Sequence, residues 1–169
     1  GYHPHNAKAV TKADMNVLAE AVKLEKVVAV GETGLDFHYN FSKQELQKDL
    51  FRGILDIAAA AGKPVIVHTR NAFDETFEIL NEYAGQLTGA VVHCFSGSIE
   101  QAKAVLEKGW LVSFTGIITF KNGESVREAA RAVPVERMMV ETDCPYISPT
   151  PVRNVKPCEP AMVVHTAKK

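Results

Sequence analysis

Five short apolar runs, separated by segments with helical patterns, constrain the fold of this chain more than any other feature. Their bulky and β-branched residues show little polar alternation, which is typical of strands buried on both faces. Such strands, alternating with helices, predict a parallel sheet covered by helices, either an open doubly wound sheet or part of a (β/α)8 barrel. The runs are Lys26–Val30, Pro64–Val67, Ala90–Val92, Trp110–Phe114 and Arg137–Val140.

The segments between the runs contain recognisable helix starts. Ser42 precedes Glu45 by three residues, and Ser98 precedes Gln101 by three, which is the capping-box spacing. Further helices are expected at about residues 11–24, 71–83, 122–132 and 160–169. The helix that begins at Ser42 is predicted to bury the face formed by Leu46, Leu50, Ile54 and Ile57.

Polar residues gather directly after the strands, and this favours the barrel, because barrel enzymes carry their chemistry at the carboxyl ends of the strands. A complete barrel usually needs about 200 residues or more, whereas these 169 residues hold about five βα units. The chain also opens on a loop-like segment, residues 1–5, and stops within a helical pattern. We therefore expect an α/β fold, a partial (β/α)8 TIM barrel forming one domain over residues 1–169, from which both ends are missing.

Composition limits the possible partners. A net charge of −1 gives no general attraction for a polyanion, so nucleic-acid binding would need a local patch or a bound metal. The three cysteines form no Cys-x-x-Cys pair, and their odd number fits a reducing compartment better than a disulfide framework. Neither a signal peptide nor an apolar run of about 18 residues is visible. These features predict a cytoplasmic protein without a membrane partner.

Four residues suited to binding a divalent metal each follow a predicted strand: Glu32, His68, His93 and Asp143. Glu32 stands among glycines that permit close approach, and its carboxylate could bridge two cations. His68 and His93 end successive runs, so neighbouring strands would present two neutral imidazoles. Asp143 adds an oxygen ligand that could also accept a proton from the attacking water. Each residue alone could be structural, but together they favour a hydrolytic metal site.

The blocks around these residues resemble the signature blocks of the TatD-type metal-dependent deoxyribonucleases. The resemblance spans nearly the whole chain. It implies an amidohydrolase-like TIM barrel that hydrolyses DNA phosphodiester bonds as an exonuclease. The matching blocks are Gly31-Glu32-Thr33-Gly34-Leu35-Asp36, Val65-Ile66-Val67-His68-Thr69-Arg70, His93-Cys94-Phe95-Ser96-Gly97 and Glu141-Thr142-Asp143-Cys144-Pro145, with Gly1-Tyr2-His3-Pro4-His5 before them and Gln47-x-x-x-Phe51 between.

The same resemblance assigns roles to the four residues. It implies that Glu32 is a catalytic metal ligand that can bridge two ions, that His68 and His93 are further ligands, and that Asp143 is a ligand and the general base. The implied cofactors are divalent cations, two in the complete protein, which would neutralise charge on the attacking and leaving oxygens. Magnesium or manganese would suit the oxygen ligands, and zinc would suit the histidines.

The chain departs from the family pattern at its start. The family begins with a strand ending in His-x-His, which supplies two ligands to one metal position, and no such strand is present here. His3 and His5 have this spacing, but Pro4 and the match to a later Gly-x-His-Pro-His block place them in a loop. Hydrogen bonding is therefore expected of them rather than metal contact. The remaining ligands would then hold one metal weakly or none.

Two arginines are candidate substrate ligands. Arg70 follows the strand of His68, and its guanidinium group matches a phosphate, although a structural ion pair fits equally well. Arg153 lies in a proline-rich segment after the last metal-ligand candidate. His38 and Tyr39 either line the mouth of the site or pack beside it. Two other functions stay open: a related amidohydrolase acting on a small amide, ester or lactone, and an inactive fragment with a structural or binding role.

Overall fold

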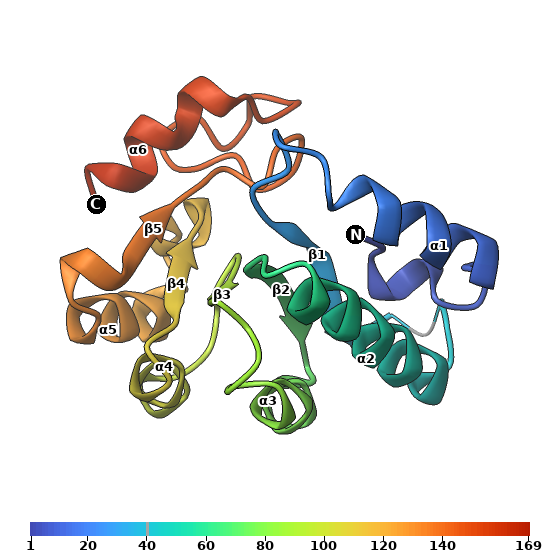
Figure 1. Cartoon of the computed structure of the whole chain (residues 1–169). Helices are drawn as coiled ribbons and strands as arrows, with labels where there is room; N and C mark the ends of the chain where they lie inside the picture. Colours follow the sequence, from blue (N-terminus) through green and yellow to red (C-terminus); the bar gives the residue numbers. More distant parts are fainter. Residues whose placement is uncertain (40) are drawn as a thin grey trace. The chain divides into compact units, whose positions relative to one another are not determined.

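The computed structural model describes residues 1–39 and 41–169 and has the predicted α/β architecture (Figure 1). Its five strands follow the order β1-β2-β3-β4-β5, and the pairs β1–β2 and β4–β5 are parallel. Neighbouring strands are consecutive in sequence, as in a (β/α)8 barrel, whereas a doubly wound sheet reverses its strand order. The partial barrel is therefore confirmed. The strands are β1 (Val30–Asp36), β2 (Val65–Arg70), β3 (Ala90–Val92), β4 (Leu111–Phe114) and β5 (Met138–Val140).

Helices alternate with the strands. The α-helices are α1 (Lys12–Ala21), α2 (Gln44–Ala60), α3 (Phe73–Glu82), α4 (Ile99–Glu107), α5 (Glu124–Ala132) and α6 (Val163–Ala167). Short 3-10 helices are η1 (Pro4–Asn6), η2 (Gly116–Thr119), η3 (Val135–Arg137) and η4 (Pro160–Met162). Within the described part of the chain, none of these helices has the length and apolar character needed to cross a membrane.

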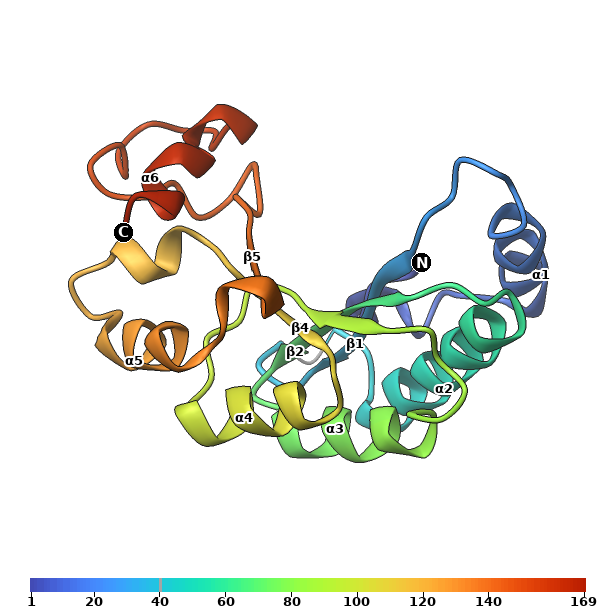
Figure 2. The ribbon, with the colours of Figure 1, turned by 60° about the vertical axis from the view of Figure 1, so that its left-hand side comes forward.

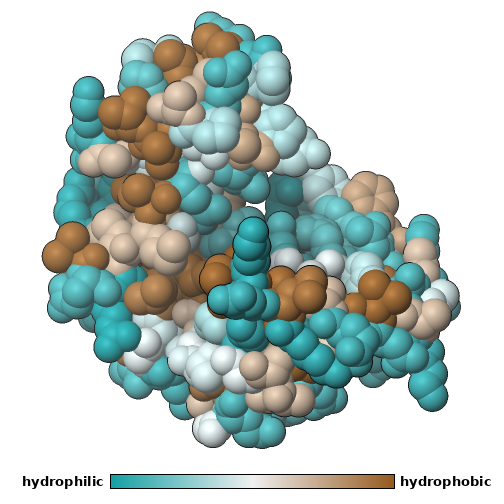
Figure 3. All heavy atoms as spheres, turned by 45° about the horizontal axis from the view of Figure 1, so that its top comes forward, coloured by the Kyte–Doolittle hydropathy of each residue, from teal (hydrophilic) through white to brown (hydrophobic). Residues whose placement is uncertain are grey.

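The chain forms two compact units, Gly1–Val91 and Val92–Lys169. In the first unit, α2 and α3 pack against β1, below the strands in Figure 2, over a core that includes Phe51 and Leu55. In the second unit, α4 packs on β4 and on α5, around Val105 and Val112. Hydrophobic residues lie in separate groups among hydrophilic ones on the face drawn in Figure 3. The expectation of one domain over residues 1–169 stays a prediction.

The position of the first strand corrects the sequence analysis. The predicted strand Lys26–Val30 is wrong, because residues 26–29 form no strand and β1 begins at Val30 and continues to Asp36. β2 likewise extends to Arg70, beyond its predicted end. Pairing of the two strands explains both extensions, because Thr33–Asp36 lie in register with Val67–Arg70 and carry polar residues and glycine into the sheet. β3 has its predicted bounds, and β4 and β5 begin one residue later than predicted.

The capping box predicted at Ser98 is present, but the one predicted at Ser42 is wrong. The hydroxyl of Ser42 instead accepts a hydrogen bond from the backbone N–H of Lys8 at 3.0 Å and donates one to the carbonyl oxygen of His5 at 2.8 Å. Ser42 therefore ties the amino-terminal loop to the start of α2. The predicted buried face is also corrected, because Leu46 is 41 % exposed whereas Gln47 beside it is buried.

Candidate metal centre

The first metal-ligand candidate, Glu32, lies within β1 and not after it. Between Val30 and Thr33, β1 contains one residue more than the matching part of β2, which runs only from Val65 to Val67. This irregularity is a β-bulge, and Glu32 lies in it. Bulges redirect side chains next to functional sites. The irregular backbone at this point therefore gives Glu32 an orientation that a regular strand would not.

Gly34 leaves room for His68 between two carboxylates. It pairs with His68 across the β1–β2 ladder, two residues before Asp36. A Cβ atom at this position would collide with the carbonyl oxygen of His68, and the φ angle of +139° also favours glycine. The imidazole of His68 then reaches both acidic side chains. Its Nδ1 lies 2.8 Å from Oε1 of Glu32, and its Nε2 lies 3.3 Å from Oδ2 of Asp36.

His3 and His5 approach the same two carboxylates from the amino-terminal loop. Nε2 of His3 lies 3.4 Å from Oε1 of Glu32, and Nε2 of His5 lies 2.8 Å from Oδ2 of Asp36. His3 caps η1, where its Nδ1 accepts the backbone N–H of His5 at 3.2 Å. The expected hydrogen-bonded loop is thus present. What the sequence did not indicate is that this loop places both imidazoles against the acidic residues of β1.

Three of these side chains form a donor set that fits a divalent cation. One nitrogen each from His3 and His68 and one oxygen of Glu32 all lie within 4.8 Å of one another, and the three residues are half-buried. Neutral imidazole nitrogens with one carboxylate oxygen are typical ligands of zinc and of similar borderline metals. The chemistry of the donor set therefore agrees with a metal centre, and the cluster includes His3, which the sequence did not favour as a ligand.

Asp36 holds the imidazoles in place. Its side chain is 1 % exposed. Burial raises the pKa of this carboxyl, but the hydrogen bond from the Tyr39 N–H and the contacts with His5 and His68 outweigh that effect, so the pKa is lowered. Gln47 fixes the strand end, accepting the Asp36 N–H at 2.8 Å and donating to its carbonyl oxygen at 3.0 Å. Asp36 is therefore an oriented anion that supports two histidines, as carboxylates do around metal sites.

The second unit contains the other two metal-ligand candidates. Nδ1 of His93 lies 3.4 Å from Oε2 of Glu141, whose Oε1 accepts the backbone N–H of Cys94 at 2.8 Å. Burial raises the pKa of Glu141, but the hydrogen bonds from His93, Ser113 and Cys94 outweigh it and lower the pKa. Asp143 follows β5 with a left-handed φ of 54°. That His93 and Asp143 ligate the same metal centre as Glu32 and His68 stays a prediction.

The two predicted substrate arginines each lie over an aromatic ring. The guanidinium carbon of Arg70 is 4.8 Å from the ring centroid of Tyr39, and that of Arg153 is 3.5 Å from the ring centroid of Phe120. No carboxylate among residues 1–39 and 41–169 forms an ion pair with Arg70. The described residues therefore do not support the alternative role of Arg70 in a structural ion pair. Substrate contact by the two arginines stays a prediction.

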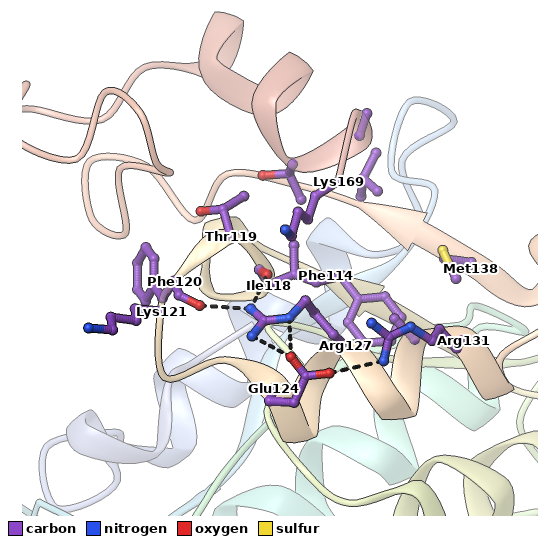
Figure 4. Close-up of a pocket in the computed structure, with 14 residues that line it drawn as sticks. Phe114, Ile118, Thr119, Phe120, Lys121, Glu124, Arg127, Arg131, Met138 and Lys169 are labelled. Atoms are coloured by element: carbon purple, nitrogen blue, oxygen red, sulfur yellow. Dashed lines mark hydrogen bonds and ion pairs between the residues drawn. The ribbon is translucent and has the colours of Figure 1, made fainter.

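A cavity of about 570 Å³ lies elsewhere in the second unit, lined by residues of η2, α5, β5 and α6 (Figure 4). Two of its cationic side chains are already engaged, because Glu124 lies 2.7 Å from Arg127 and 3.0 Å from Arg131. None of the four predicted metal ligands belongs to the lining that the structure describes. Cavity size therefore does not identify the reactive site of this chain.

Comparison with known proteins agrees with these features. A family model described as TatD related DNase matches residues 1–169. An uncharacterized metal-dependent hydrolase of Bacillus subtilis, YabD, is 37 % identical over 100 % of this chain and 66 % of its own length. The corresponding values for YcfH of Escherichia coli K12, another uncharacterized metal-dependent hydrolase, are 43 %, 99 % and 62 %. A protein of Salmonella typhimurium named 3′-5′ ssDNA/RNA exonuclease TatD is 34 % identical over 100 % of this chain and 66 % of its own.

Solved structures show the same fold. YjjV, a TatD homologue from Escherichia coli K12, superposes with a TM-score of 0.90 at 30 % identity, over 99 % of this chain and 65 % of its own. A TatD family hydrolase from Entamoeba histolytica superposes with a TM-score of 0.81 at 26 % identity, over 99 % and 64 %. The chain spans 62 to 66 % of the length of the curated relatives named above. It belongs to the family of TatD-related DNases.

Proposed function

We propose that this chain carries the metal centre of a deoxyribonuclease that hydrolyses DNA phosphodiester bonds as an exonuclease and depends on divalent cations. The convergence of His3, Glu32 and His68 carries the proposal. Family membership supports the hydrolytic class. The relatives named 3′-5′ ssDNA/RNA exonuclease support a nucleic-acid substrate attacked from an end of the strand.

His3, Glu32 and His68 would hold the cation, which supplies positive charge to stabilise the phosphodiester oxygens as negative charge builds on them. Each ring nitrogen of His68 faces a carboxylate: Nδ1 lies 2.8 Å from Oε1 of Glu32, and Nε2 lies 3.3 Å from Oδ2 of Asp36. The contact with Asp36 orients the ring so that Nδ1 and the Glu32 carboxylate lie side by side, where both could bind the same cation.

The other acidic side chains have two roles: some orient the histidines, and one accepts a proton. The buried carboxylate of Asp36 keeps His5 and His68 oriented, so the donor atoms need little rearrangement on binding. Glu141 does the same for His93 in the second unit. We keep for His93 the role of a further ligand, and for Asp143 the roles of ligand and of general base that accepts the proton of the attacking water. Family membership supports these roles.

Metal binding can be tested without any assay of activity. Titration calorimetry with Zn²⁺ or Mn²⁺ should show binding to the chain, and Glu32→Gln should weaken it at least about tenfold, because the neutral amide replaces an anionic ligand. Glu45→Gln is the matched control, since Glu45 lies on α2 with its side chain 81 % exposed and pairs only with Lys48 among the described residues. Equal affinities of the wild-type and Glu32→Gln proteins would contradict the proposed centre.

Activity is tested on end-labelled single-stranded DNA with Mg²⁺, Mn²⁺ or Zn²⁺. We expect stepwise shortening of the labelled DNA. EDTA, Glu32→Gln and Asp143→Asn should each abolish the shortening, and Glu45→Gln should leave it unchanged. Model amides, esters and lactones are assayed in parallel. Hydrolysis of those small substrates with intact DNA would favour the amidohydrolase instead. Metal binding without any hydrolysis would favour a binding role.

A further inference from the structure

Two exposed aromatic rings are stacked beside the metal centre. The ring centroids of Tyr39 and Phe41 are 5.2 Å apart and their planes differ by 11°. Tyr39 is 40 % exposed and Phe41 is 54 % exposed. Both rings also pack against the His5 imidazole in T-shaped contacts, with centroid distances of 5.5 Å and 4.9 Å. Because the ring centroids of His5 and His3 are 4.1 Å apart, only the His5 ring separates this aromatic pair from the proposed metal ligand His3.

The contacts with His5 give the pair a defined orientation. The His5 ring is nearly perpendicular to both aromatic planes, at 88° to Tyr39 and 81° to Phe41. Edge-to-face packing of this kind stabilises the two rings in one arrangement. A flat ligand that stacks on Phe41 therefore meets a surface that is already formed, which lowers the entropy cost of binding.

A cation lies on the same surface. The guanidinium group of Arg70 lies over the Tyr39 ring, and no carboxylate in the described part of the chain pairs with it. Arginine can stack on an aromatic ring and still donate hydrogen bonds to a phosphate group. The surface thus combines an open aromatic face, a cation and a neighbouring metal centre.

We propose that Tyr39 and Phe41 form a platform on which an unpaired base stacks, while Arg70 binds a backbone phosphate of the same strand. The proposal rests on the function proposed above and assigns the surface that holds one base and one phosphate of its substrate. A base inside a duplex has both faces covered by its neighbours, so the platform favours an unpaired base. Every base has an aromatic face, and binding is therefore expected to tolerate any sequence.

The platform is tested with two fluorescent single strands of equal length, an oligothymidine and an oligomer of abasic residues that carries the same phosphates. Binding is measured by anisotropy in EDTA, so that no cleavage competes. We expect Phe41→Leu to weaken binding of the oligothymidine by about 5- to 100-fold and to leave binding of the abasic oligomer unchanged. Phe41→Trp should restore binding. Phe73→Leu is the matched control, because Phe73 belongs to another stacked pair, with Phe77 on α3.

Arg70→Gln should weaken both strands alike and reduce the salt dependence of binding by about one phosphate contact. Any of three results would overturn the platform. They are tight binding of the abasic oligomer, equal affinities of the Phe41→Leu and wild-type proteins for the oligothymidine, and no binding of either strand. Its failure is distinct from failure of the proposed function. Cleavage of DNA at equal rates by the wild-type and Phe41→Leu proteins counts against the platform alone. Base-dependent binding without any metal-dependent cleavage counts against the nuclease alone.

Discussion

Replacing Gln47 with methionine is expected to destabilise the first unit and to loosen its metal centre. Gln47 is 1 % exposed. Its side chain accepts the Asp36 N–H at 2.8 Å and donates to the carbonyl oxygens of Asp36 at 3.0 Å and of Ser42 at 2.9 Å. Methionine has a similar length and volume, so the substitution removes three hydrogen bonds while leaving little empty space.

The expected loss can be worked from these contacts. Three hydrogen bonds at about 1 kcal/mol each give about 3 kcal/mol. We therefore expect a loss of about 3 kcal/mol, which is a large share of the roughly 5–15 kcal/mol that stabilises a typical domain. The metal affinity should fall as well, because Asp36 then supports His5 and His68 less rigidly.

Urea unfolding followed by circular dichroism measures the free energy of unfolding, and calorimetry with Zn²⁺ measures the affinity. Gln86→Met is the matched control, since Gln86 is exposed and makes one long hydrogen bond of 3.4 Å. The control should change the free energy of unfolding by less than about 0.5 kcal/mol. A loss below about 1 kcal/mol in Gln47→Met, or one no larger than in the control, would refute the reasoning, because buried hydrogen bonds would then not hold the strand end.

Three further perturbations are measurable in the same unfolding assay. Gly34→Ala should cost about 2 kcal/mol or more, because the new Cβ meets the carbonyl oxygen of His68 and the backbone has a positive φ; a neutral effect would show that the strand shifts freely. Thr11→Ala should cost about 1 kcal/mol by removing the capping box of α1, and an unchanged midpoint would contradict that role. Burial and then the hydrogen bond to Asp56 raise the pKa of Tyr83 to about 12. The unfolded chain releases this proton near pH 10, so stability should fall as the pH rises from about 10 towards 12, and Tyr83→Phe should flatten that decline.

The sheet was largely predictable because most of its strands are continuous apolar runs. Ala90–Val92 is recognised with its correct bounds, since buried parallel strands leave little choice of composition. β1 was not recognised, because it consists of a bulge, two glycines and two acidic residues that no hydrophobic period marks. Its extended form depends on pairing with β2, and pairing is a tertiary interaction that a local pattern does not report.

The candidate site was predictable where a ligand ends an apolar run, as His68 does. Asp36 belongs to the same signature block as Glu32, yet its role depends on two histidines that lie 31 and 32 residues away in the sequence. Glu141 was passed over for the same reason, because its contact with His93 joins residues 48 positions apart. Carboxylates that orient histidines are found by distance in the fold, although an acidic residue close to a predicted ligand is a usable signal.

In the sequence alone, Pro4 argues against metal contact by His3 and His5, but in the structure it shapes the turn that places both imidazoles against carboxylates. Proline is suited to the first positions of a helical turn because its φ angle is already fixed, and Pro4 begins η1. The turn brings the two imidazole centroids to 4.1 Å, yet each ring engages a different carboxylate, His3 at Glu32 and His5 at Asp36. A His-x-His spacing on a strand supplies two ligands to one ion. On this turn the same spacing supplies one candidate ligand and one histidine that helps to hold Asp36, so the spacing has meaning only together with the backbone that carries it.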